Sequence, residues 1–129
     1  MNHRKAVFLA FAAMLLAASA WAHHNMSAVF DFNDRVTLTG TLTKIDWRNP
    51  HIELVVNAKN ADQAQTWSFE GPPPSFFRAR GIEKGDVESS IGKMVTAEAS
   101  RARDGSRWGL LRTMTLADGK ILSACPQNC

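Results

Sequence analysis

The chain has 129 residues, a length that suits one domain and excludes a chain of several domains. It has 15 Lys and Arg against 12 Asp and Glu, and two of the basic residues, Arg4 and Lys5, lie at its start. Without those two, the rest of the chain is close to neutral. A dedicated nucleic-acid binder usually has a clear basic excess, so the charge argues against nucleic acid as the partner.

A secretory signal peptide is predicted at the N-terminus. Arg4 and Lys5 precede an apolar run over residues 6–18, and small residues follow that run. The run is short for a membrane span, and no other run is long enough. The chain is therefore expected to be exported to a bacterial periplasm, with no stable membrane insertion after processing.

Two cleavage positions satisfy the small-x-small rule, one after Ala20 and one after Ala22. The second is preferred, so residues 1–22 are expected to be the signal peptide and His23 the mature N-terminus. The first cut would leave Trp21 as the first residue instead. About 107 residues remain after the preferred cut, enough to bury one modest core.

The segment after the signal peptide contains three apolar residues, Val29, Phe30 and Phe32, which are expected to dock on the folded domain. Asn33-Asp34 is then a turn signal.

A long, bent strand is predicted next. Apolar residues alternate with threonines from Val36 to Thr43, the pattern of a half-buried strand. The apolar phase then moves to Ile45 and Trp47, and a strand keeps one buried face through such a shift only with a bend or a bulge. Gly40 lies near the change, where a strand glycine often marks a bend. A long bent first strand suits a small closed barrel.

A tight turn over residues 48–50 ends this strand, and His51 opens the next one. The second strand is expected to bury alternate residues, namely Ile52, Leu54 and Val56. The turn therefore places the His51 imidazole at one open end of the predicted barrel.

The remaining elements follow in order. We expect a polar hairpin loop over 57–65, a third strand over 66–70, a short helix over 75–80, and a connector over 82–90 with room for another helical turn. A fourth strand over 93–100, a fifth over 107–116 and a return strand over 120–124 are separated by two Asp-Gly turns.

Three strands, a helix, two strands and a hairpin arm form the order of elements in an OB-fold. The predicted fold class is all-β with one short helix: a small OB-like five-stranded barrel plus a C-terminal hairpin arm, with the domain at residues 23–124. A small β-sandwich or an incomplete roll is the alternative.

Both cysteines, Cys125 and Cys129, lie in a tail over residues 125–129. Export to an oxidising compartment favours a disulfide. Pairing with another chain and thiolate metal binding are the alternatives.

Several pieces of the chain carry a family resemblance: His23-His24, Phe30-Asp31, the run VTLTGTLTKIDWRNPH, the Trp67–Glu70 strand, Arg103–Ser106 and the Thr115–Gly119 turn. Together they resemble a family of small exported bacterial proteins classed as a domain of unknown function. The usual pattern there is a His-His-Ser start, a Phe-Asp pair, a Trp-x-Asn-Pro-His turn and a closing Thr-Leu-Ala-Asp-Gly hairpin. This chain departs from it at Asn25, where serine is usual, and in its helix and connector. The resemblance covers essentially the whole mature chain and implies export and fold, but no reaction.

His23, His24 and His51 are the histidines that remain after processing, and they are the predicted metal ligands. A mature N-terminal His offers its α-amine and ring Nδ1 together, and a second imidazole would complete a three-nitrogen site. Amine and imidazole ligands in tetragonal geometry suit Cu(II), which heads the divalent affinity order, so copper is the expected cofactor. The earlier cut would also leave a copper ligand set, with His23 in third position. The alternative is a structural role, with a disordered N-terminus and His51 bonding backbone.

A second candidate site is a basic rim of Arg101, Arg103, Arg107 and Arg112, the first three of which flank the Asp104-Gly105 turn. In an OB-fold the loops after the first and fourth strands lie near the binding face, which would bring Arg48 close to these residues. Arginine forks match carboxylate, sulfate or phosphate groups. The alternative function is therefore an envelope interaction module that binds an anionic ligand or a partner protein; the plainer interpretation is a solvated hairpin with internal salt bridges.

The sequence contains no Ser-His-acid elbow, Gly-rich phosphate loop or zinc-protease motif, so the protein is not expected to be an enzyme. Asp46 and Glu53 flank the turn and are candidates to orient His51. Three tryptophans, Trp47, Trp67 and Trp108, are expected to serve packing rather than a stacking platform.

Overall fold

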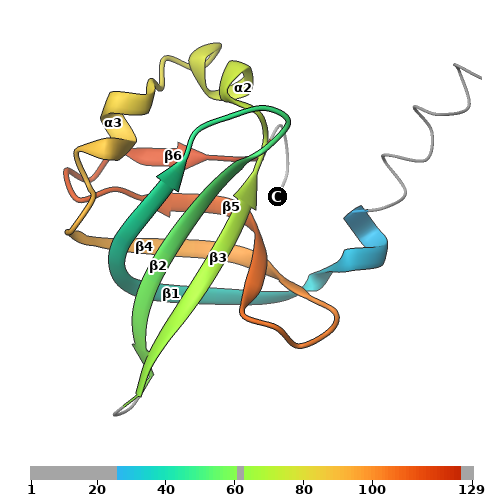
Figure 1. Cartoon of the computed structure of the whole chain (residues 1–129). Helices are drawn as coiled ribbons and strands as arrows, with labels where there is room; N and C mark the ends of the chain where they lie inside the picture. The colour runs from blue at the N-terminus through green and yellow to red at the C-terminus, as the bar shows by residue number, and fades with distance from the viewer. Residues whose placement is uncertain (1–25, 61–62, 126–129) are drawn as a thin grey trace, which may run out of the picture.

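The computed structural model describes residues 26–60 and 63–125 (Figure 1). Residues 26–29 form a single helical turn. The strands and helices that follow are β1 (Phe30–Asp46), β2 (Ile52–Asn60), β3 (Gln63–Gly71), α2 (Pro74–Arg78), α3 (Lys84–Glu88), β4 (Met94–Ala102), β5 (Trp108–Thr115) and β6 (Ile121–Ser123). The described chain is thus mostly strand, as the sequence predicts.

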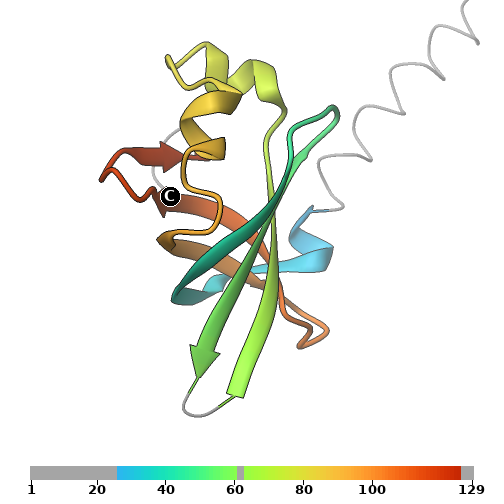
Figure 2. The same cartoon turned by 60° about the vertical axis from the view of Figure 1, so that its left-hand side comes forward.

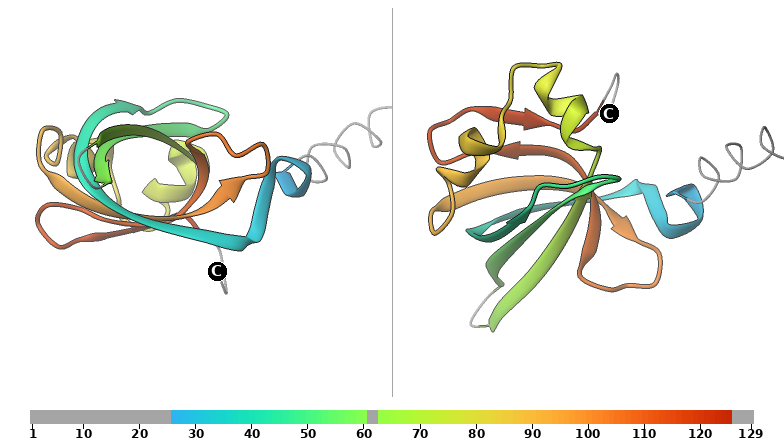
Figure 3. Two further views of the ribbon diagram at one scale, coloured as in Figure 1. Left: turned by 90° about the horizontal axis from the view of Figure 1, so that it is seen from below. Right: turned by 45° about the horizontal axis from the view of Figure 1, so that its top comes forward.

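The strands form one sheet in the order β3-β2-β1-β4-β5-β6, and β3 also pairs with β5. The β3–β5 pairing is parallel and the others are antiparallel. The extra pairing turns the sheet back on itself, and the barrel-like ring is visible from below (Figure 3). The circuit β1-β2-β3-β5-β4-β1, with the helices between β3 and β4, is that of the OB-fold, and β6 adds the predicted C-terminal arm.

β1 has 17 residues and serves both halves of the ring. Its first part pairs with β4 as far as Thr41, and its second part pairs with β2 from Gly40 onwards. The register with β2 shifts between Leu42 and Lys44. The predicted bulge is therefore confirmed, and it explains why the apolar phase changes after Leu42.

The start of β1 differs from the prediction. Asn33-Asp34 does not end a segment, because the strand already begins at Phe30 and absorbs these residues in a register shift between Asp31 and Arg35. Phe30 is fully buried as expected, but Phe32 is 43% exposed. The irregularity changes which face the residues after it present, so Phe32 turns to solvent.

The β2–β3 hairpin is longer than predicted. The expected loop over 57–65 is wrong, because Asn57 pairs with Thr66 and Lys59 pairs with Ala64. In this segment the exposed Asn57 and Lys59 stand on either side of Ala58, which is buried. Such alternation is typical of a half-buried strand rather than of a loop. The predicted inner face of β2 is confirmed by three fully buried residues, Ile52, Leu54 and Val56.

α2 and α3 cover one end of the ring, where Phe77 and Val87 are fully buried (Figure 2). The Trp47 ring packs on Phe77 with centroids 5.3 Å apart, and Trp67 stacks beside Phe69 in the core. Trp47 and Trp67 therefore pack against core aromatic rings, which is the role expected of them.

The predicted signal peptide over residues 1–22 lies outside the described residues. Cys129 lies outside them as well. Cys125, the last described residue, is disulfide-bonded. Across the residues that the structure describes, no helix is both long and apolar enough to cross a membrane.

Candidate functional site

The β1–β2 turn holds His51 against the neighbouring strand β3. His51 follows a cis Asn49–Pro50 peptide bond, and the next residue, Ile52, pairs with Gly71. Glu70 therefore lies beside the turn, and its Oε1 is 2.8 Å from His51 Nδ1.

This contact defines how the imidazole is oriented. An ionised carboxylate can only accept a hydrogen bond, so the ring carries its hydrogen on Nδ1 and donates it to Glu70. The His51 side chain is 45% exposed, and its Nε2 has no hydrogen-bond partner in the ranges 26–60 and 63–125. Nε2 is thus the ring nitrogen available to a ligand.

Glu70 belongs to a row of carboxylates that crosses three strands. Asp46 of β1 pairs in register with Glu53 of β2, and Glu53 pairs with Glu70 of β3. Each has its own partner: Arg48 lies 2.9 Å from Asp46, and the Ser68 hydroxyl donates to Glu53. We expected Asp46 or Glu53 to orient His51, but the structure assigns that contact to Glu70.

Glu70 is the site residue that the sequence analysis missed. A signal for it existed in the hairpin register. The strand that starts after the turn and the strand that ends at Gly71 are antiparallel neighbours, so the residue before Gly71 must lie next to the turn.

Two of the three predicted metal ligands, His23 and His24, lie outside the described residues. Within residues 26–60 and 63–125, no group of three or more His, Cys, Asp and Glu side chains is arranged to hold a metal ion. This part of the chain therefore contributes one oriented imidazole, that of His51.

A chain of contacts links the first strand residue to His51. The Phe30 ring lies against Trp108, with centroids 4.7 Å apart, and Trp108 pairs with Ser68 of β3. Glu70 follows two residues later and holds His51. The helical turn 26–29 and the β1–β2 turn accordingly lie on the same flank of the ring in the different views (Figures 1–3).

The basic hairpin between β4 and β5 is paired with the start of β1. Arg101 Nε lies 3.4 Å from Asp34, and Arg103 Nη1 lies 3.2 Å from Asp31. Arg103 Nε also donates to the Ser27 carbonyl at 2.9 Å. A groove of about 430 Å³ runs between these ion pairs.

The four predicted anion-binding arginines are not gathered in one place. Arg101 and Arg103 line the same groove, whereas Arg48 pairs with Asp46 at the β1–β2 turn. Arg107 has an exposed side chain, and its carbonyl accepts a bond from the Ser68 backbone at 3.0 Å.

Arg112, on β5, was predicted to belong to the basic rim, and that prediction is wrong because the side chain is buried in the sheet. Its side chain is 9% exposed, and its Nη1 donates to the buried Ser100 hydroxyl at 3.0 Å. Desolvation lowers the pKa of Arg112, nearby Arg35 adds to that effect, and Glu98 opposes it. Arg112 Nε has no hydrogen-bond partner in the described chain, and its distance to Glu98 is 3.9 Å.

Comparison with known proteins identifies a family for this chain. Neither the curated proteins nor the solved structures contain a significant match to the chain. Residues 12–112 match the family of unknown function DUF6152. That match covers most of the chain, including the β1–β2 turn and the β4–β5 hairpin. The chain therefore belongs to the DUF6152 family, a family of unknown function.

Proposed function

We propose that this chain is an exported, periplasmic binding protein without enzymatic activity, and that it binds Cu(II) at the β1–β2 turn. His51 supplies one imidazole, the mature N-terminal His23 supplies its amine and its ring, and His24 is a reserve ligand. The observation that carries the proposal is the 2.8 Å contact between His51 Nδ1 and Glu70.

That contact is the arrangement in which proteins commonly hold a metal-binding histidine. A carboxylate that accepts from one ring nitrogen fixes the tautomer and raises the basicity of the other nitrogen. In this chain the other nitrogen is Nε2 of a side chain that is nearly half exposed. Nitrogen ligands of this kind, with an amine, favour Cu(II) among the divalent ions.

A shared site requires the N-terminal segment to reach the β1–β2 turn. Two residues lie between His23 and Met26, the first described residue, and three extended residues span about 10 Å. The helical turn at 26–29 lies on the flank that also carries the β1–β2 turn. The proposal therefore places the N-terminal amine on this flank, beside His51.

The proposal is tested by titrating the mature protein with Cu(II), after mass spectrometry has established that His23 is the first residue. Isothermal titration and the nitrogen hyperfine splitting in electron paramagnetic resonance spectra measure affinity and ligand type. We expect His51→Ala to weaken binding by about 100-fold, and Glu70→Gln to weaken it by about tenfold because the ring loses its carboxylate partner.

Two further proteins make the result specific. Acetylation of the His23 α-amine blocks that ligand without adding a residue, and it should weaken binding as His51→Ala does. Thr115→Ala, on the exposed face of β5, is the matched control and should bind as the wild type does. Equal affinity for the wild type, His51→Ala and the acetylated chain contradicts the proposal.

The second candidate function is an envelope interaction module that binds an anionic ligand or partner through Arg48, Arg101, Arg103 and Arg107. The groove beside Arg101 and Arg103 favours it. Binding of a purely anionic ligand is disfavoured, because both arginines already have aspartate partners and the groove has little excess positive charge. A pull-down from envelope extract, repeated with Arg101→Ala and Arg103→Ala, tests it, and an unchanged set of partners counts against it.

A further inference from the structure

We propose that the groove at the β4–β5 turn binds a small zwitterion, of the size of an amino acid or a dipeptide. The ligand's carboxylate contacts the arginines of the groove, and its ammonium group contacts an aspartate. This site is separate from the copper site and uses none of its ligands.

The groove is built by three segments that lie far apart in the sequence. It runs between the start of β1, the end of β4 and the β4–β5 turn, and its polar lining comprises Asp31, Asp34, Arg101, Arg103, Gly105 and Ser106. Its volume of about 430 Å³ lies in the range of small-molecule pockets.

The arginines keep hydrogen-bond donors for a ligand. Arg101 contacts Asp34 through Nε, at the long distance of 3.4 Å. Arg103 uses Nε and Nη1 for Ser27 and Asp31. A guanidinium has five N–H donors, and among the described residues no hydrogen bond involves the two Nη groups of Arg101 or Nη2 of Arg103, so these donors can contact a carboxylate.

Asp34 is the acceptor for the ammonium group. Both oxygens of Asp31 are used, one by the Asn33 backbone N–H at 3.0 Å and the other by Arg103. Within the ranges 26–60 and 63–125, Asp34 contacts Arg101 through Oδ1 alone, and its side chain is 56% exposed. Its Oδ2 is therefore the acceptor that can receive a ligand's ammonium hydrogens.

The balance of charge selects a ligand with both signs. Two guanidinium groups and two carboxylates line the groove, and the flanking Arg107 and Asp104 also cancel. A ligand with a single charge gains little binding free energy from a site whose charges cancel, and it is repelled by the groove residues of its own sign. A zwitterion meets an opposite charge at each end.

Hydrogen bonds hold the turn that lines the groove. Asp104 Oδ1 accepts from the Ser106 backbone N–H at 2.9 Å, and hydrogen bonds from the Ser106 side chain and then from its backbone lower the pKa of Asp104. Gly105 provides the positive φ of 77° that the turn needs. The Arg103 backbone N–H donates to the Val29 carbonyl at 2.8 Å. The backbone of the turn therefore needs little further ordering when a ligand binds.

The test uses three probes that differ in charge: glycylglycine, N-acetylglycine with a carboxylate alone, and glycinamide with an ammonium alone. Amide chemical shifts of the mature protein are followed by NMR at low ionic strength. We expect saturable shifts at Gly105 and Ser106 with glycylglycine, and binding at least about tenfold weaker for each singly charged probe, since each lacks one charge-assisted contact.

Variants locate the contacts. Arg101→Gln and Asp34→Asn should each weaken glycylglycine binding about tenfold. Lys84→Gln removes an exposed ion pair on α3 and should leave binding unchanged. The spectra also report whether each variant is folded. If Arg101→Gln does not fold, glycylglycine binding by Asp34→Asn tests the proposal.

Three results would overturn the assignment. The first is the absence of saturable shifts with glycylglycine. The second is equal binding of N-acetylglycine or of glycinamide, which would make the groove a site for one sign of charge. The third is unchanged binding in both Arg101→Gln and Asp34→Asn. A failure of copper binding leaves this site untouched, because the two sites share no residue.

Discussion

Gly40 is the residue at which β1 passes from one half of the ring to the other. It pairs with Val95 of β4 on one side and with Ala58 of β2 on the other. A Cβ at this position would lie 2.8 Å from the Ala58 Cα, and closer still to the Asn57 carbonyl. Both neighbours are backbone atoms that are held in the sheet, so the two strands approach this closely only at a glycine.

Gly40→Ala should therefore lower the free energy of unfolding by about 1–3 kcal/mol, because the added methyl group displaces the β2 backbone. Chemical denaturation at 25 °C measures the change. Gly85→Ala is the matched control, since nothing lies within 4 Å of its Cβ in α3. That change should stabilise the protein slightly, by about 0.5 kcal/mol. Equal stability of Gly40→Ala and the wild type would show that the close approach does not constrain the fold.

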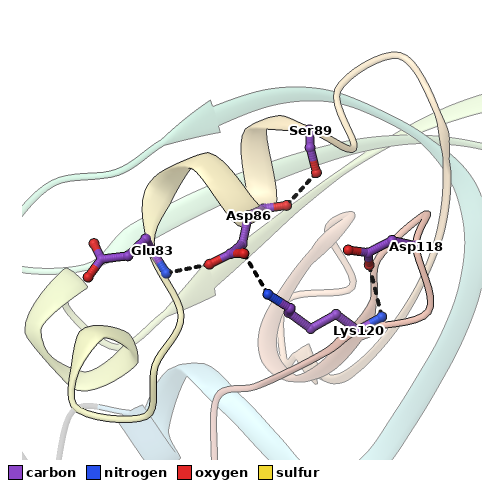
Figure 4. A network of polar contacts seen from close by, with 5 residues as sticks. All are labelled: Glu83, Asp86, Ser89, Asp118 and Lys120. Atoms are coloured by element: carbon purple, nitrogen blue, oxygen red, sulfur yellow. Dashed lines mark hydrogen bonds and ion pairs between the residues drawn. The ribbon is translucent and has the colours of Figure 1, made fainter.

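α3 is tied to the turn before β6 by a polar network (Figure 4). Lys120 Nζ lies 2.5 Å from Asp86 Oδ1, while Asp86 Oδ2 accepts from the Glu83 backbone N–H at 2.8 Å. The latter bond is one half of a capping box at the start of α3. Asp118 accepts from the Lys120 backbone N–H, which fixes the turn itself. A helix of five residues is too short to be stable alone, so it depends on such contacts.

The network predicts a pH dependence of stability. The hydrogen bond from Lys120, helped by that from Glu83, lowers the pKa of Asp86 below its ordinary value of 3.8. A lowered pKa in the folded state means that the carboxylate contributes stability above pH 3.8, and that this contribution is lost as the pH falls through the folded value. The same bond raises the pKa of Lys120 above 10.5, so its contribution is lost only as the pH rises through its folded value.

Asp86→Asn should accordingly be less stable than the wild type near neutral pH, and the difference should shrink as the pH falls below 3.8. Denaturation curves across that pH range measure it. Glu88→Gln is the control, because Glu88 forms an exposed pair with Lys84 on the same helix. A difference that stays constant down to acid pH would mean that the Asp86 charge does not stabilise α3.

The ring as a whole depends on the seam between β3 and β5. Three register pairs join these strands, and the Phe69–Gly109 pair lies at the centre. Phe69 is fully buried, and a Cβ on Gly109 would lie 3.3 Å from its ring. The aromatic side chain thus fills the space that the glycine leaves, and it holds the two ends of the ring together.

Phe69→Ala should lower the free energy of unfolding by about 3–5 kcal/mol, since it leaves a cavity at the seam. Far-UV circular dichroism and tryptophan fluorescence should report one shared transition, because closing the ring couples all of its strands. Phe76→Ala, at a half-buried ring under Arg80, is the control and should cost less. Phe69→Leu keeps the test possible if the alanine variant does not fold. Separate transitions by the two methods, or an equal cost for Phe76→Ala, would contradict the role of the seam.

Much of the fold follows from local patterns in the sequence. The alternation of Ile52, Leu54 and Val56 fixes the inner face of β2, because side chains on a strand point to opposite faces in turn. The change of phase after Leu42 predicts the bulge, and the Asp-Gly pairs predict turns at Gly105 and Gly119, both of which have positive φ. The turn signal at Asn33-Asp34 and the loop over 57–65 were wrong, because strand pairing with distant residues overrode local preference.

The candidate site, like the fold, was predictable from the sequence only in part. The sequence by itself determined that one imidazole, His51, stands at a proline turn, and that arginines flank an Asp-Gly turn, because both are matters of neighbouring residues. Only the tertiary structure decided that Glu70 holds His51 and that Arg101 and Arg103 face Asp34 and Asp31. Those partners come from other strands, and which side chains meet depends on the register that the closed ring imposes.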